Sequence, residues 1–133
     1  MRDIKTSLVY RWFEEVWNNS NRNAIDKLLT TDVITNGIDT KSQSGIEGFK
    51  TFYDNFRNDF SDVQVIVEDV ITQDDIESAR CTVTATHNND GKAVKFSGNA
   101  TIRVRDGKIA EAWNNYDFLN LYQQLGQKLT PAE

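Results

Sequence analysis

The sequence changes its hydrophobic period once, near residue 63, and this change constrains the fold more than any other feature. Before it, apolar residues recur three and four positions apart, which is the spacing of amphipathic helices. After it, apolar and polar residues alternate, which is the spacing of half-buried strands. Helices are therefore expected in the first half and strands in the second, a segregation typical of an α+β domain.

Three helices and one short strand are expected before the change. The first helix covers about residues 3–18 and the second lies near residues 22–29. Residues 30–35 then form a loop that enters the short strand. Ser44 is a candidate N-cap for the third helix, with Glu47 three positions further on as in a capping box. The third helix has an aromatic face, formed by Ile46, Phe49, Phe52, Tyr53, Phe56 and Phe60.

Two hairpin signals divide the second half, Asn-Asn-Asp-Gly at residues 88–91 and Asp-Gly at residues 106–107. The strands between them are expected to pair antiparallel in a meander. In the last strand, the alternation of side chains places the Asp117 carboxylate on the same face as the Trp113 indole, four residues earlier. That face consists of Ile109, Glu111, Trp113, Asn115 and Asp117.

The apolar face of such a sheet must be covered, and the N-terminal helices are the available cover. We therefore expect a cone-shaped, curved antiparallel sheet with helices across its concave side. Side chains fill the narrow end of a cone, whereas its wide end can stay open as a pocket.

Composition limits the partners of this chain. Its 133 residues predict one domain over residues 1–133, and the net charge of −5 argues against a general nucleic-acid binder. No apolar run approaches the ~20 residues of a membrane span, and the N-terminus lacks a signal-like stretch, so a cytoplasmic protein is expected. Cys81 is the sole cysteine and His87 the sole histidine, which predicts neither a disulfide nor a metal site.

Several segments in order along the chain carry a family resemblance, the most specific being Trp113-x-x-x-Asp117 and Gln123-Gln124-Leu125-Gly126. The chain resembles the SnoaL-like polyketide cyclase (ester cyclase) family of the nuclear transport factor 2-like superfamily. The other matching segments are Trp12-Phe13, Trp17, residues 32–37, 45–52 and 60–63, Thr86-His87 and residues 106–113.

The resemblance implies a cone-shaped α+β barrel that forms a homodimer or higher homo-oligomer, with an apolar small-molecule pocket and no cofactor or metal. It also implies an intramolecular aldol closure in which Asp117 is the general acid/base that removes an α-proton. Histidines assist in the family, which points to His87 here. Asn36 stands where relatives commonly carry histidine, and Ala85-Thr86-His87 replaces the usual Gly-Thr-His.

Each candidate residue also has a structural interpretation. Asp117 can be the N-cap of a final helix that starts near Phe118, or a proton-transfer group whose pKa is raised by burial beside Trp113. His87 can orient a substrate carbonyl or lie idle beside its turn. The expected substrate-binding residues are Trp113, Asn36, Asn115, Tyr53 and Trp17, of which the aromatic ones can equally be core and the asparagines turn or strand-end residues.

The expected function is therefore cofactor-free acid/base catalysis, an aldol-type cyclisation or an isomerisation, on a hydrophobic polyketide-like or cyclic substrate. The alternatives are a non-catalytic small-ligand-binding protein or a dimerising scaffold of the same fold. The face of the sheet with Ser97, Asn99 and Thr101 is polar but uncharged at its centre, which suits a homodimer interface.

Overall fold

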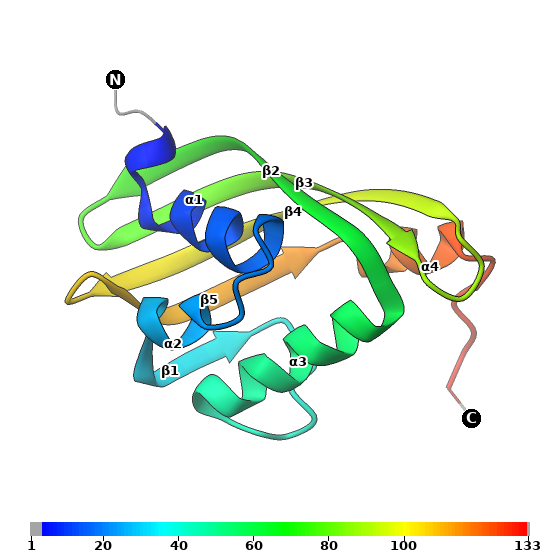
Figure 1. Cartoon of the computed structure of the whole chain (residues 1–133), viewed down its shortest axis with the longest axis horizontal. Helices are drawn as coiled ribbons and strands as arrows, with labels where there is room; N and C mark the ends of the chain where they lie inside the picture. Colours follow the sequence, from blue (N-terminus) through cyan, green and yellow to red (C-terminus); the bar gives the residue numbers. More distant parts are fainter. Residues whose placement is uncertain (1–3, 133) are drawn as a thin grey trace.

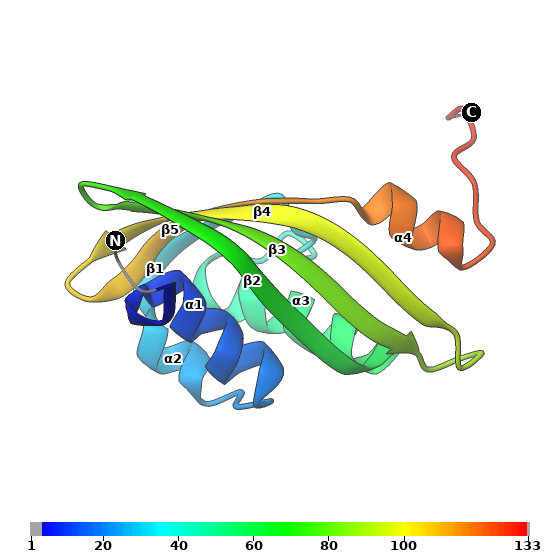
Figure 2. The same ribbon diagram turned by 90° about the horizontal axis from the view of Figure 1, so that it is seen from above.

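A computed structural model describes residues 4–132 of the chain. Its five strands form one curved sheet in the order β1-β5-β4-β3-β2. The strands are β1 (Leu29–Asn36), β2 (Phe60–Gln73), β3 (Ile76–His87), β4 (Ala93–Arg105) and β5 (Lys108–Tyr116). Figures 1 and 2 show that α1 (Leu8–Trp12), α2 (Ala24–Leu28) and α3 (Gly45–Asp59) lie on one side of this sheet. The expected α+β architecture, with helices across a curved sheet, is confirmed.

Strands β2 to β5 pair antiparallel through hairpins, as their alternation predicts. β1, in contrast, pairs with β5 in parallel. The loop and α3 after β1 lead the chain to β2 at the opposite edge of the sheet. β1 can therefore lie beside β5, the last strand of the meander. The sheet is therefore mixed, and its one parallel pair is an addition to the expected antiparallel sheet.

The first helical region is divided into three pieces rather than one helix over residues 3–18. A 3-10 turn at Ile4–Thr6 (η1) precedes α1, and a π-helical segment at Phe13–Asn18 (η2) follows it. Ser7 causes the first break, because its hydroxyl accepts a hydrogen bond from the Tyr10 amide and donates one to the Ile4 carbonyl. Residue 3 of the predicted helix lies outside the described residues.

Glu77 of β3 caps α1 from outside the helix. Its carboxylate accepts hydrogen bonds from the backbone amides of Leu8 at 3.3 Å and Val9 at 2.8 Å. These amides belong to the first turn, where no helical carbonyl is available to them. A carboxylate at a helix N-terminus typically contributes about 0.3–1 kcal/mol, so Glu77 ties the first helix to the sheet.

The third helix begins at Gly45, as expected, with Ser44 in the N-cap position. The Ser44 side chain nevertheless makes no capping hydrogen bond, so the predicted capping box is wrong. Glu47 instead lies 4.0 Å from the ammonium group of Lys50, one turn further along the same helix.

Two side-chain amides complete strand backbones where no neighbouring strand is present. The Asn18 amide accepts from the Val65 N–H at 2.6 Å and donates to its carbonyl at 2.9 Å, on the outer side of β2. The Gln124 amide makes the same pair of bonds with Lys95 of β4, at 3.0 and 2.7 Å. Gln124 belongs to α4 (Phe118–Gln124), which lies beyond the end of β5 (Figure 1).

The core lies between the sheet and the helices. Val9, Val16, Ile25 and Cys81 are fully shielded from solvent there, and Leu121 attaches α4 to the same core. Among residues 4–132, the structure contains no helix with the length and apolarity needed to cross a membrane.

Candidate functional site

A hollow lies between the concave face of the sheet and the helices. Its empty space, including a mouth open to solvent, is ≈ 490 Å³, but the part in which the centre of a water molecule fits is only ≈ 50 Å³. The space that a ligand could fill without movement of the wall is therefore small. Its wall is aromatic and apolar except for two polar residues, Asn114 and Tyr116. The other wall residues are Trp12, Phe13, Trp17, Ile38, Phe49, Phe52, Phe56, Val63, Val65, Val83, Phe96 and Phe118.

Aromatic rings from α1, η2 and α3 narrow the hollow from the helical side. Trp17 lies edge-on to Phe49 and Phe56, with ring centroids 6.4 and 5.6 Å apart, and Trp12 contacts Phe49 at 4.9 Å. Such edge-to-face pairs add about 0.5–1.5 kcal/mol each to the burial of their area. Phe52 and Phe56 are only half-buried, so they lie toward the solvent side of the hollow.

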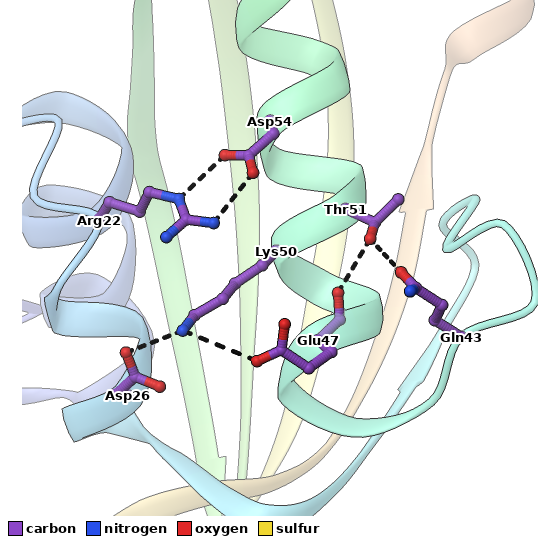
Figure 3. A network of polar contacts seen from close by, with 7 residues as sticks. All are labelled: Arg22, Asp26, Gln43, Glu47, Lys50, Thr51 and Asp54. Carbon is purple, nitrogen blue, oxygen red and sulfur yellow. Dashed lines mark hydrogen bonds and ion pairs between the residues drawn. The ribbon is translucent and has the colours of Figure 1, made fainter.

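A polar network on the outer side of α3 holds this helix and its rings in place (Figure 3). Arg22 donates two hydrogen bonds to Asp54, at 3.0 and 2.9 Å, and the Lys50 ammonium group lies 3.0 Å from Asp26. Gln43 and the Glu47 carbonyl both accept from the Thr51 hydroxyl. The pairs are largely exposed and individually weak, but together they join α3 to α2 and to the loop before α3.

One wall of the hollow is formed where β1 meets β5. The Asn36 amide donates to the Ala112 carbonyl at 3.0 Å, and the Asn114 amide donates to the Asn36 carbonyl at 3.0 Å. Gly37 then turns the chain with φ +83° and lies so close that a Cβ there would be 1.9 Å from the Asn114 oxygen. The two asparagines thus fix the strand pair, and they place the Asn114 side chain in the wall.

Tyr116 lies across β4 toward β3. Its register partner is Gly98, which in turn faces Cys81, so the three residues form a row across three strands. A Cβ on Gly98 would lie 2.3 Å from the Tyr116 ring, so glycine is what makes room for this ring. The hydroxyl is buried without a hydrogen bond to oxygen or nitrogen among residues 4–132, and its polar neighbour is the Cys81 thiol.

Asp117 follows directly and is the N-cap of α4. Its carboxylate accepts a hydrogen bond from the Asn120 amide at 3.0 Å, and its own amide donates to the Ser97 carbonyl at 2.9 Å. The residue is exposed, so the burial expected beside Trp113 is wrong. Tyr116 and Phe118 on either side of it both line the hollow, whereas Asp117 itself is not part of the wall.

This combination of a curved sheet, an aromatic hollow and an aspartate between two wall residues can be compared with known proteins. The family model for the SnoaL-like polyketide cyclase matches residues 7–125. The chain belongs to this family. The comparison with curated proteins gave no significant match.

Solved structures of similar proteins agree with this membership. A proposed polyketide cyclase from Bacillus cereus is 30% identical, with a TM-score of 0.81 over 92% of this chain and 80% of its own. IdmH, a proposed polyketide cyclase from Streptomyces antibioticus, has the same fold at 21% identity. Its TM-score is 0.81, and the match covers 94% of this chain and 100% of IdmH. AclR, a proposed hydroxylase from Streptomyces galilaeus, also shares the fold at 24% identity. Its TM-score is 0.72, and the match covers 84% of this chain and 87% of AclR. The fold alone therefore does not define the reaction.

Some of the predicted site residues of this SnoaL-like chain meet around the hollow. Trp17 is part of its wall. Tyr53 lies behind that wall, where it packs on Trp17 at 4.8 Å and donates its hydroxyl hydrogen bond to the Val16 carbonyl at 3.0 Å. Asn36 supports Asn114 from β1. The substrate-binding roles expected of these residues stay predictions.

Trp113 and Asn115 lie on the other face of β5. Trp113 is paired with Thr101, and the Arg103 guanidinium lies over its ring at 6.0 Å. The expected common face with Ile109 is wrong, because the register shifts between Arg103 and Val104 and leaves Ala110 as an extra, unpaired residue. Such a bulge reverses which side chains point inward. Trp113 and Asn115 therefore face away from the hollow.

His87 is the last residue of β3. Its Nδ1 is 3.0 Å from the Asp90 carboxylate, and its ring packs on Phe60 at 5.3 Å. His87 is not part of the hollow's wall, and the assisting role expected of it stays a prediction. Over the described range 4–132, no cluster of three or more His, Cys, Asp or Glu side chains is arranged to hold a metal ion.

Sequence reasoning missed Asn114 and Tyr116, the two polar residues of the wall. Regular alternation from Ile109 places both residues on the face of β5 that is turned away from the helices. Nothing in the local sequence marks Ala110 as the bulge. A signal does exist at Gly98, since a glycine within a long strand indicates a bulge or a close approach. Here it marks the position over which Tyr116 lies.

The convex face of the sheet is turned away from α1, α2 and α3, and in Figure 2 only α4 lies on its side, at one end. Ile66 and Ile71 are 50% and 74% exposed, and the Ser78 and Thr101 hydroxyls lie 2.9 Å apart across β3 and β4. The homodimer expected from the sequence would use this face. It stays a prediction, which sedimentation equilibrium of the purified chain would test by its mass.

Proposed function

We propose that the chain binds a hydrophobic ring compound bearing carbonyl groups in the hollow, and catalyses proton transfer on it without a cofactor. The reaction class is an aldol-type cyclisation or a related isomerisation. The observation that carries the proposal is the position of Asp117 between two wall residues of an aromatic hollow, in a chain of the SnoaL-like family.

The hollow suits a flat, apolar molecule better than a polar one. Its wall supplies aromatic faces and edges, and two polar side chains, Asn114 and Tyr116, are available to fix orientation. Few polar groups within an apolar pocket are typical of small-molecule sites. Phe52 and Phe56 are half-buried, so a ligand larger than the hollow would extend past them toward solvent.

The proposed reaction needs only the substrate and the Asp117 carboxylate, which takes up one proton and later returns it. Asp117 takes the proton from a carbon between two carbonyl groups, and the electron pair left behind spreads onto the neighbouring oxygen as an enolate. The enolate carbon attacks a second carbonyl of the same molecule and forms the new C–C bond. The protonated carboxyl group then returns its proton to the alkoxide that this attack creates.

A non-catalytic binding protein is the second candidate, and one observation favours it. Asp117 is exposed and its carboxylate already accepts a hydrogen bond from Asn120 in the helix cap. A general base gains from a site shielded from bulk water. In the catalytic proposal the bound ligand provides this shielding by covering the mouth, whereas in the binding proposal Asp117 is a cap and nothing more.

Binding and proton transfer can be measured on one sample. Trp12 and Trp17 line the hollow and Trp113 does not, so a Trp113→Phe variant reports ligand entry by the emission of the wall tryptophans. The probe is a bicyclic β-keto ester, with exchange of its α-proton in D₂O followed by NMR. Binding with accelerated exchange supports catalysis, and binding without it supports the second candidate. Neither effect, at probe concentrations up to its solubility, would rule out both.

A further inference from the structure

The Tyr116 hydroxyl is a buried donor without a strong acceptor. Three buried side-chain polar atoms among residues 4–132 lack a hydrogen bond, and they belong to Thr30, Arg57 and Tyr116. Of these three residues, Tyr116 is the one that lines the hollow. A buried polar group without a partner costs about 1–3 kcal/mol, and natural proteins keep such groups mainly where they serve a purpose.

The polar neighbour of this hydroxyl is a poor hydrogen-bond acceptor. Its neighbour is the Cys81 thiol, and sulfur is a weak acceptor. Burial raises the pKa of Cys81 to about 11 and raises the pKa of Tyr116 well above its usual value, so both groups hold their protons at neutral pH. The row formed by Cys81, Gly98 and Tyr116 therefore offers two X–H groups, and the group it lacks is an acceptor oxygen.

The placement of the ring is specific. Gly98 leaves room for the Tyr116 ring against β4, and any larger residue would collide with the ring and with the backbone of β5. Phe96 and Phe118 contact the same ring from two further directions, at 6.3 and 6.0 Å. The hydroxyl is therefore held in one position, which is the condition for an oriented hydrogen bond to a ligand.

We propose that Tyr116 binds the ligand directly, by donating its hydroxyl hydrogen bond to a carbonyl or enolate oxygen at the deep end of the hollow. This inference rests on the proposed small-molecule function and deepens it. It specifies a ring compound whose carbonyl oxygen enters first, while the hydrocarbon part lies among the aromatic rings. The same hydroxyl would stabilise negative charge that develops on that oxygen during enolate formation.

The first test separates a ligand-binding hydroxyl from a structural one by thermal unfolding of the free protein. Tyr116→Phe removes an unsatisfied donor, so its melting temperature should equal that of the wild type or exceed it by ~3 °C. Tyr53→Phe is the matched control, because the Tyr53 hydroxyl is buried and does have an acceptor. Tyr53→Phe should lower the melting temperature by ~3 °C, because it leaves the Val16 carbonyl without its donor. Loss of stability or of folding in Tyr116→Phe would overturn the inference.

The second test uses two bicyclic probes that differ in one oxygen, 1-tetralone and its hydrocarbon counterpart tetralin. The wild type should bind the ketone about tenfold more tightly than the hydrocarbon, which is the difference expected from one hydrogen bond of ordinary strength. Tyr116→Phe should lose that preference while its affinity for tetralin stays unchanged. The carbonyl stretching band of tetralone bound to the wild type should lie at lower frequency than that of tetralone bound to Tyr116→Phe.

The outcomes distinguish this inference from the function on which it rests. If both probes bind and Tyr116→Phe keeps the ketone preference, Tyr116 does not hold the oxygen, whereas the binding function stands. If the wild type binds neither probe, the small-molecule function fails and the inference fails with it. If the ketone preference disappears only in Tyr116→Phe, the inference is supported.

Discussion

Replacing Gly37 by alanine should destabilise the protein by about 3–5 kcal/mol, a large share of the 5–15 kcal/mol typical of a domain. Two effects combine at this position. Gly37 has φ +83°, where an L side chain is strained by about 1–2 kcal/mol. A Cβ there would also lie 1.9 Å from the Asn114 oxygen, which is backbone and cannot rotate away. β1 and β5 would have to separate, with loss of the hydrogen bonds of Asn36 and Asn114.

Gly107→Ala is the matched control for Gly37→Ala. Gly107 has φ +75° in the hairpin turn, but a Cβ there meets nothing within 4 Å. It should therefore show the conformational cost alone, about 1–2 kcal/mol. Urea unfolding of the wild type and both variants measures the difference. Equal losses in the two variants would mean that the close approach of Gly37 to β5 has no energetic weight.

Asp117→Asn should reduce the proton-transfer rate by about 10²–10⁴-fold while leaving the fold intact, if the proposed catalysis is correct. An asparagine oxygen can still accept from the Asn120 amide, so the cap of α4 is kept. Only the capacity to take up a proton is lost. The measurement is α-proton exchange of the β-keto ester probe, together with the affinity of that probe, which should change little.

Asp117→Ala separates the two roles of this residue. It removes both the carboxylate and the cap, so it should match Asp117→Asn in exchange rate and in addition lose about 1 kcal/mol of stability. Asn115→Ala serves as a neutral control at an exposed neighbour on the same strand end. Unchanged exchange in Asp117→Asn would assign Asp117 to capping alone and would favour the binding protein over the enzyme.

Local chemistry made much of this fold predictable. Asp106 and Gly107 both adopt positive φ in the final hairpin, as an Asp-Gly turn requires. The start of α3 after Ser44 and of α4 after Asp117 follows from residues that favour N-caps, even though only Asp117 uses its side chain for this. These features depend on a few neighbouring residues, which is why a pattern can reveal them.

The site was less predictable because it depends on a long-range irregularity. The bulge at Ala110 arises where β5 must pair with β4 on one side and with β1 on the other. One extra residue moved Asn114 and Tyr116 into the wall and Trp113 out of it. The parallel pairing of β1 likewise depends on contacts between residues 75 positions or more apart, such as Asn36 with Glu111 and Ala112. Periodicity carries no information about either.

The amides of Asn18 and Gln124 have a consequence for how copies of this chain can meet. A strand with free N–H and C=O groups invites a strand from another molecule, and this route leads to domain swapping or fibrils. Asn18 occupies these groups at Val65, and Gln124 occupies them at Lys95. Each acts as a one-residue substitute for a neighbouring strand. At these two points a strand from a second copy cannot extend the sheet sideways.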